Sequence, residues 1–336
     1  MSGGPLWTDE SNVFWEIGGA LYRREASLNL QNFVYYTSLE TAEKIISSRT
    51  VWMRNSAHMN DSTEICYGFE CLEQAWNMPG GTRFRKAVSF RAGVEEIIRA
   101  WFERGGTTFR DNVYLTCVSE HLPAEHAGGR LSMWRAYGRK NGVAMVLKPE
   151  ALLVFDSYIP VYALPVLYGG VEDANAHLDH VASELEYINW AVTNDRNSWD
   201  APEHLDDDSF VLSASAYFQA LATRIKHPGF REEREWRIIY IDELFPVPFF
   251  GLLRPRLKAH TACINNQRQV IYTLPLDGSV PESKTLASII DHVIVGPGLS
   301  QEETAQRMIL ALESLGFEDA KRRVRLSDIP LRAPDA

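Results

Sequence analysis

A dense run of charges leads directly into an apolar run in the segment 229–241, which reads GFREEREWRIIYI. The residues Ile238–Ile241 are β-branched or aromatic, which is typical of a buried strand. Because successive side chains of a strand point to opposite faces, Glu233, Glu235 and Arg237 are expected to share one face. Burying two carboxylates and an arginine costs free energy unless the charges are paired or used. This segment is therefore the best candidate for a working site.

Lys226 precedes this segment and can pair with Glu233. The alternative interpretation is a surface ladder of ion pairs at the entrance of a strand, where each exposed pair contributes only about 0–1 kcal/mol. The sequence leaves both open.

Composition narrows the class of protein. The chain has 336 residues with 45% hydrophobic and 23% charged residues, which is ordinary for a globular protein. Its net charge of −10 repels nucleic acid, so a nucleic-acid substrate would need a local basic patch. The four cysteines form no CxxC pair, so neither a structural zinc site nor a disulfide framework is expected, and we predict no metal ligands.

Membrane and export signals are also not expected. No apolar run approaches the roughly 18–20 residues needed to span a bilayer. The N-terminus has no basic region followed by an apolar one. We therefore predict a cytoplasmic protein of bacterial type without a membrane partner.

The order of patterned segments predicts an α+β fold with a mixed or antiparallel central sheet and flanking helices. Predicted strands lie at 33–37, 50–54, 113–118, 143–147, 159–168, 233–241, 269–274, 292–296 and 323–326. Predicted helices lie at 39–46, 83–104, in two pieces within 171–225, and after a capping box formed by Ser300 and Glu303. Ser38 is the expected N-cap of the first helix, and the apolar stripe of the second is Val94, Ile97, Ile98 and Trp101. We expect an N-terminal extension over 1–30 and one domain over 31–330, with a helical insertion near 171–225.

Two constellations near the N-terminus could bind a ligand. Tyr35, Tyr36 and Thr37 on the first strand suit stacking and hydrogen bonding to a nucleotide, although the same residues are simply good strand formers. Asn60 and Asp61 could hold a ligand from an ordered loop. They could equally form a turn in which Asp61 caps the next helix.

Two further sets complete the candidates. Glu64 lies three residues after Asp61 and could complete that cap. Trp134 and Tyr137, in the segment 133–137, could form a ligand platform, although packing into the core explains the same pattern.

Taken in order, these segments resemble the bacterial domain of unknown function 2971 family. The pieces that carry the resemblance are Tyr35-Tyr36-Thr37, Asn60-Asp61 with Glu64, Val118-Ser119, Met133-Trp134 with Tyr137, Lys226 with Glu233–Arg237, and Val295-Gly296-Pro297. They span roughly residues 33–297, and their order and spacing carry the resemblance. The family name implies an architecture and states no activity.

A second resemblance concerns chemistry. A first strand with an aromatic or basic residue, a later strand ending in Ser or Thr, and a Glu-x-Glu entering a strand are similar to the ADP-ribosyltransferase layout. The matching residues here are Tyr35, Tyr36, Thr116, Ser119, Glu233 and Glu235. The chain departs from that layout where Tyr35-Tyr36 replaces the usual Arg or His, and where an acidic insertion lengthens the path from Ser119 to Glu235.

This second resemblance implies NAD as the nucleotide, with Glu235 nearest the reacting ribose and Glu233 assisting. Cleaving the N-glycosidic bond of NAD builds positive charge on the ribose, which a nearby carboxylate stabilises. The second carboxylate can orient or deprotonate an acceptor, either nucleic acid or protein. A toxin or phage-defence role is compatible with such an activity.

Two other functions stay open. The first is a metal-dependent nuclease in which Asp61, Glu64, Glu233 and Glu235 bind Mg²⁺ and Lys226 is the basic partner, which requires the carboxylates to lie within about 4–5 Å of one point. The second is a ligand sensor without enzymatic activity, in which the segment 233–237 is a structural ion-pair network.

Overall fold

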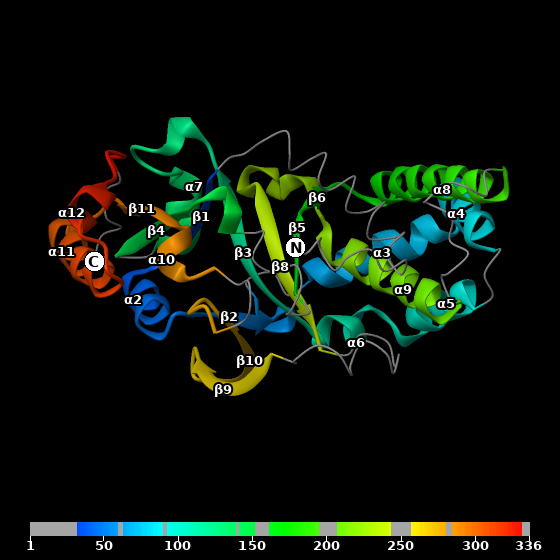
Figure 1. Ribbon diagram of the computed structural model, residues 1–336, viewed down its shortest axis with the longest axis horizontal. Helices are drawn as coiled ribbons and strands as arrows, with labels where there is room; N and C mark the ends of the chain where they lie inside the picture. Colours follow the sequence, from blue (N-terminus) through cyan, green and yellow to red (C-terminus); the bar gives the residue numbers. More distant parts are fainter. Residues whose placement is uncertain are drawn as a thin grey trace, which may run out of the picture.

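The computed structural model describes residues 32–59, 63–89, 93–138, 141–151, 161–194, 207–242, 257–279 and 284–330 (Figure 1). The predicted extension over 1–30 lies outside these ranges, as do the predicted ligand-binding residues Asn60 and Asp61.

A mixed sheet forms the centre of the molecule, and the predicted α+β class is confirmed. Its strands are β1 (Asn32–Ser38), β2 (Thr50–Asn55), β3 (Val113–His121), β4 (Gly142–Leu147), β5 (Val161–Pro165), β8 (Glu235–Ile241), β9 (Lys258–Ile264), β10 (Gln267–Pro275), β11 (Ile290–Val295) and β12 (Val324–Leu326). They run in the order β12-β11-β4-β1-β3-β2-β10-β9, and β8 pairs with both β3 and β5. Neighbours are antiparallel except β11 and β12, which are parallel.

Two groups of helices cover the sheet, one toward each end of the view in Figure 1. The first group is α3 (Glu64–Trp76), α4 (Pro79–Val88), α5 (Val94–Arg104), α6 (Gly106–Asp111), α8 (Val171–Asn194) and α9 (Asp207–Arg224). The second is α2 (Leu39–Ser48), α10 (Leu286–Ile289), α11 (Gln301–Ser314) and α12 (Ala320–Arg323). Short elements connect them: α7 (Leu131–Met133), the π-helix η4 (Trp134–Gly138), the 3₁₀ helices η2 (Ser56–His58), η3 (Pro123–Glu125), η5 (Pro149–Ala151) and η7 (Pro228–Glu233), and a parallel pair, β6 (Leu167–Tyr168) with β7 (Ile225–Lys226).

Strand alternation divides the core between the two faces of the sheet. On one face, Leu115 and Ile239 pack against the helices of the first group. The same face also carries Val34 and Tyr36, which form a separate apolar cluster with Trp134. The opposite face packs against the second group through residues such as Val118, Trp236 and Ile238. The first face therefore holds two apolar clusters with a seam between them.

Local sequence signals correspond well to several elements. The Oγ of Ser38 accepts a hydrogen bond from the backbone N–H of Thr41, as expected of an N-cap. The buried residues of α5 include Val94, Ile98 and Trp101 of the predicted stripe.

Two predictions about helices are wrong. The helix predicted over 83–104 is two helices, α4 and α5. Gly93 has a φ of 94° and begins a new helix there, which a continuous helix could not accommodate. The Ser300–Glu303 capping box does not form, because Ser300 adopts ψ 27° rather than an extended conformation and its side chain caps no N–H.

The entrance to β8 also differs from the prediction. Glu233 ends η7, and β8 begins only at Glu235. Alternation along a strand therefore places Glu235 and Arg237 on one face, but it does not apply to Glu233. Arg234 takes a left-handed conformation with φ 45° between the two glutamates, which turns the chain.

Candidate active site

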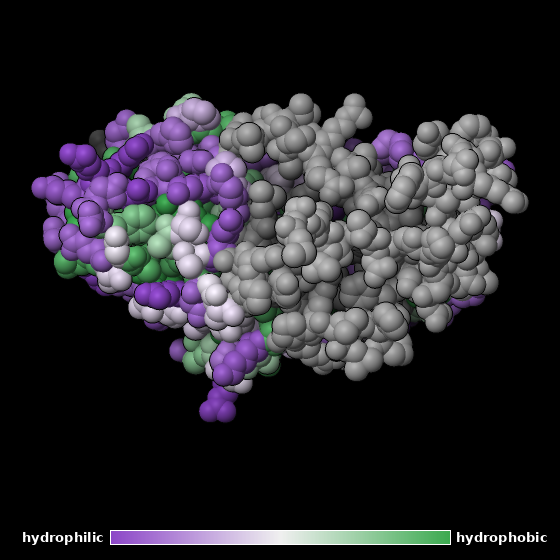
Figure 2. All heavy atoms as spheres, in the orientation of Figure 1, coloured by the Kyte–Doolittle hydropathy of each residue, from purple (hydrophilic) through white to green (hydrophobic). Residues whose placement is uncertain are grey.

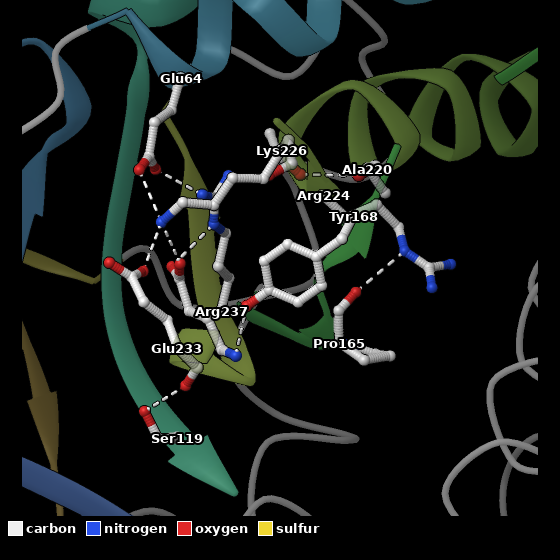
Figure 3. A network of polar contacts seen from close by, with 11 residues as sticks. Glu64, Ser119, Pro165, Tyr168, Ala220, Arg224, Lys226, Glu233 and Arg237 are labelled. Carbon is white, nitrogen blue, oxygen red and sulfur yellow. Dashed lines mark hydrogen bonds and ion pairs between the residues drawn. The ribbon is translucent and has the colours of Figure 1, made fainter. Parts of the chain in front are cut away.

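The seam between the two apolar clusters is occupied by charged side chains from four elements (Figure 3). Glu64 is the first residue of α3, Lys226 ends β7, Glu233 ends η7, and Glu235 and Arg237 belong to β8. We call these five residues the charged cluster. Because most members stand at the end of an element, their side chains can converge without interrupting a helix or a sheet.

Lys226 lies at the centre of the charged cluster. Its Nζ is 2.6 Å from Glu64 Oε1, 2.6 Å from Glu233 Oε2 and 2.7 Å from Glu235 Oε2. The ammonium group has three N–H donors, and each has a carboxylate acceptor. The ring of Phe230 lies 4.8 Å from the same nitrogen. Lys226 is therefore fully paired.

Arg237 joins two of the same carboxylates from the other side. Its Nε lies 2.9 Å from Glu235 Oε1, and its Nη2 lies 2.5 Å from Glu64 Oε2. Its Nη1 donates to the backbone carbonyl of Thr223 at 2.6 Å. Glu64 and Glu235 thus each bridge Lys226 and Arg237, whereas Glu233 contacts Lys226 alone within the cluster.

Three of the five members of the charged cluster are buried, so the alternative interpretation of a surface ion-pair ladder is wrong. Arg237 is 0% exposed, Lys226 3% and Glu235 7%. Glu233 is the most accessible member, with 23% of its side chain exposed. Three carboxylates face two cations, so the cluster has one negative charge in excess. Buried charges are tolerated only when they are paired, and one carboxylate here is incompletely compensated.

The two glutamates of the Glu-x-Glu pair have opposite pKa shifts. Burial opposes ionisation of Glu235, but Arg237 and Lys226 outweigh it and lower its pKa well below the ordinary value. Burial raises the pKa of Glu233, and Lys226 only partly offsets this. Two neighbouring carboxylates with pKa values pushed apart are typical of a general acid–base pair. Glu235 therefore stays ionised at neutral pH, and Glu233 holds a proton more readily than an ordinary glutamate does.

Uncharged groups complete the surroundings. The Oγ of Ser119 donates to the backbone carbonyl of Glu233 at 2.7 Å. The backbone N–H of Glu235 donates to the hydroxyl of Tyr168 at 2.7 Å. Burial is the largest cause that raises the pKa of Tyr137, and the charge of Glu233 is the next largest. Burial and the charge of Glu235 raise the pKa of Cys117. Both groups therefore stay protonated beside the carboxylates.

Three adjacent strands carry Tyr36, Ser119 and Glu235. β3 lies between β1 and β8, and Ser119 is paired directly with Val34 on one side and with Glu235 on the other. Residues that are directly paired share a face, and Tyr36 shares the face of Val34 by alternation. Three of the predicted site residues are thus on one face of neighbouring strands.

The other predicted nucleotide-binding residues lie on the opposite face. Tyr35, Thr37 and Thr116 alternate with Tyr36 and Ser119 along their strands. Tyr35 and Thr116 line an apolar cavity of about 40 Å³ between α2 and α10, a region where apolar residues reach the surface in Figure 2. A cavity of this size is too small for a nucleotide. The structure therefore does not bring these three residues together with the charged cluster.

Trp134 and Tyr137 have different environments. Trp134 is buried, its ring centroid lies 4.9 Å from that of Tyr36, and its Nε1 donates to the carbonyl of Gly128 at 2.7 Å. A Cβ on Gly296 would approach its ring to 2.9 Å, so a glycine is required there. Trp134 is a core residue, whereas Tyr137, in the same π-helix, extends toward the charged cluster. π-Helical turns are frequent at functional sites.

Sequence reasoning did not find Tyr168, Cys117 or the second ion pair of Glu64. Tyr168 lies in a two-residue strand, and Cys117 is one of four scattered cysteines, so no local pattern distinguishes them. The contact of Glu64 with Arg237 joins residues far apart in the chain. Cys117 lies two residues before Ser119 on β3, so strand alternation places both side chains on one face. That was the only signal in the sequence that could have identified the thiol.

The fold and site define an α+β protein with a glutamate–lysine–arginine cluster on one face of its central sheet. The sequence of residues 133–238, which includes Tyr137, Lys226, Glu233, Glu235 and Arg237, matches the family model described as protein of unknown function (DUF2971). The predicted resemblance to this family is confirmed over those residues. No curated protein and no solved structure matches the chain. Among the described residues, no helix is both long and apolar enough to cross a bilayer.

Proposed function

We propose that this protein is an NAD-dependent enzyme of the ADP-ribosyltransferase type, which transfers ADP-ribose to a protein or nucleic-acid acceptor. The observation that carries the proposal is the arrangement of β1, β3 and β8 as neighbours, with Tyr36, Ser119 and Glu235 on one face. A layout with an aromatic residue, a hydroxyl and a Glu-x-Glu on successive strands is the one that the ADP-ribosyltransferase resemblance implies.

Glu235 is assigned to the stabilisation of charge on the ribose. Its lowered pKa keeps it ionised, and two cations fix its position. A carboxylate that is already oriented stabilises developing positive charge without reorganising in the transition state. Loss of such a group typically lowers a rate by about 10²–10³-fold. Lys226 and Arg237 act as positioning residues for this carboxylate.

Glu233 is assigned to proton transfer at the acceptor. Its raised pKa makes it a stronger base than an ordinary glutamate, and it is the most accessible carboxylate of the charged cluster. A general base is most effective when its pKa lies near the working pH. The hydrogen bond from Ser119 to the Glu233 carbonyl holds the turn that presents this side chain.

Nicotinamide release tests the proposal. Purified wild-type protein is incubated with NAD and EDTA, and free nicotinamide is measured over time. We expect release without a divalent cation, because the charges that the reaction needs come from Glu235, Glu233 and the two basic residues. Absence of release, with and without candidate acceptor proteins and nucleic acids, would contradict the proposal.

A metal-dependent nuclease is the second candidate, and one observation favours it. The carboxylates of Glu64, Glu233 and Glu235 meet within 2.7 Å of one point, which is closer than the roughly 4–5 Å that a shared Mg²⁺ requires. That point is occupied by the ammonium group of Lys226, so a metal ion would have to displace it. Cleavage of RNA or DNA that requires Mg²⁺ and is lost in Glu64→Gln, with no nicotinamide release, would favour the nuclease.

A further inference from the structure

Three histidines from distant parts of the chain form a second cluster outside the charged cluster. His121 ends β3, His126 follows η3, and His292 lies in β11. Their ring centroids are 4.8 Å apart for His121 and His126, 5.5 Å for His126 and His292, and 5.9 Å for His121 and His292. The three rings thus form a nearly equilateral triangle.

The sheet register explains why these rings meet. His121 is paired with Asn32 of β1, and His292 is paired with Val146 of β4. Because β1 and β4 are neighbours and Val34 is paired with Val146, both histidines lie on the face that also carries Ser119. The loop that follows β3 then returns His126 to within hydrogen-bond distance of His121.

We propose that His121, His126 and His292 bind one divalent transition-metal ion, with Zn²⁺ the best match. One ring nitrogen of each residue lies within 4.8 Å of those of the other two. Nε2 of His121 and Nδ1 of His126 are 2.9 Å apart. Zn–N bonds of about 2.0–2.1 Å in a tetrahedral site separate ligand nitrogens by about 3.3 Å, so small side-chain shifts produce the required geometry.

Unsatisfied ring nitrogens are the second observation. His121 is 1% exposed and His292 3%, yet Nδ1 of His121 and Nε2 of His292 have no hydrogen-bond partner among the residues that the structure describes. A buried polar atom without a partner is unfavourable. Nε2 of His292 belongs to the proposed ligand set, and metal binding would satisfy it.

A carboxylate stands behind one of the rings. Nδ1 of His292 lies 2.8 Å from Asp291 Oδ2, whereas Glu125 Oε2 lies 4.0 Å from Nδ1 of His121, beyond hydrogen-bond distance. A carboxylate behind a ligating histidine fixes its tautomer and strengthens it as a ligand. Arg130 and Arg325 also act on the rings, and Arg234 and Arg323 act on the two carboxylates.

Three imidazoles leave a fourth position open, as in zinc sites that bind water or a substrate. His126 is only half-buried, so this position can be reached from solvent.

Metal titration tests the site without any assay of activity. Tag-free protein is stripped with a chelator, dialysed and titrated with Zn²⁺ against a chromophoric indicator, and with Co²⁺ for the visible absorption of a tetrahedral site. The variants are His126→Gln, His292→Gln and Asp291→Asn. His260→Ala is the matched control, because His260 is an exposed histidine on β9 outside the cluster.

The proposal predicts one metal ion per chain in the wild type and in His260→Ala. Asp291→Asn should weaken binding by about 10–100-fold, the usual effect of losing such a partner, and the two ligand variants should weaken it further. Wild-type protein that binds no stoichiometric metal, or His126→Gln with wild-type affinity, would overturn it. His126 is half-buried, so that variant decides the matter even if His292→Gln fails to fold. Neither result bears on nicotinamide release.

Discussion

Lys226 places a single ammonium group among three carboxylates, and this pairing makes the charged cluster compatible with burial. Burial alone would lower the pKa of Lys226, but Glu235 and Glu64 outweigh it and raise the pKa above the ordinary value. The lysine is therefore charged at every pH at which the protein folds. Without it, Glu64, Glu233 and Glu235 would have only Arg237 as a cationic partner in the cluster.

Lys226→Met tests this dependence. Removing one partner of a buried ion pair typically costs about 3–5 kcal/mol, because the other charges stay buried. We expect that loss in the free energy of unfolding, measured by urea denaturation at pH 7. Lys44→Met, at an exposed position of α2, is the control and should be nearly neutral.

The pH dependence of this variant separates lost charge from lost packing. Without the ammonium group, the folded-state pKa values of the carboxylates rise above those of the unfolded chain. Their protonation then favours the folded state as the pH falls. The deficit of Lys226→Met should therefore shrink from pH 7 to pH 5. A deficit that stays constant would show that packing, and not charge, is responsible.

At the scale of elements, α3 must lie close to α9 for Glu64 to reach Lys226. A Cβ on Gly68 of α3 would lie 2.1 Å from the carbonyl oxygen of Ala222 and 3.0 Å from that of Ile225. These are backbone atoms, which cannot move aside as a flexible side chain can. Gly68 therefore sets the spacing between α3 and α9. It lies one helical turn after Glu64, the first residue of the charged cluster.

Gly68→Ala should push α3 away from α9 and weaken the pairing of Glu64. Overpacking of this kind costs about 1–3 kcal/mol, although alanine is intrinsically the better helix former. The loss is measured as a shift in the urea midpoint. The control is Glu73→Ala, an exposed position of the same helix. A Gly68→Ala variant as stable as the wild type would show that α3 and α9 do not approach each other this closely.

Predictability from the sequence differs between elements and contacts. The Ser38 cap and the buried stripe of α5 depend on residues a few positions apart, and both are predicted correctly. Strand alternation also predicts that Glu235 and Arg237 share a face. Glu64 joins them through contacts between residues more than a hundred positions apart, which local patterns do not specify. The histidine triangle was missed for the same reason.

At the scale of the whole molecule, several buried groups make stability depend on pH in the same direction. Burial alone would raise the pKa values of Glu235 and Glu125, but their partners outweigh it. Arg237 and Lys226 lower the pKa of Glu235, and the Leu122 N–H and Arg130 lower that of Glu125. Each carboxylate stabilises the folded state at pH values above its ordinary pKa of 4.5. This stability is lost as the pH falls through the folded-state pKa. The pKa of His121 is lowered to about 4, so below pH 6.5 the unfolded chain binds a proton that the folded protein does not. Glu233 has a raised pKa and acts in the opposite direction.

The free energy of unfolding should therefore fall as the pH drops below 4.5, where Glu235 and Glu125 lose their contribution and that of Glu233 is already complete. Urea denaturation at successive pH values measures this free energy. The slope m of the free energy of unfolding against urea concentration checks that the unfolded state is comparable at each pH. Stability that is constant or rises over this range would contradict the charge states assigned to the buried residues.

Glu235 is proposed to act on the ribose of NAD, and a comparison of two glutamine variants tests this role. Glu235→Gln preserves the shape of the side chain and removes its charge, and Glu232→Gln makes the same change at an exposed glutamate three positions earlier. The rate of nicotinamide release is measured for both variants and normalised to folded protein. We predict that Glu235→Gln lowers the rate by about 10²–10³-fold and that Glu232→Gln keeps the wild-type rate. Equal rates for Glu235→Gln and the wild type would contradict the account.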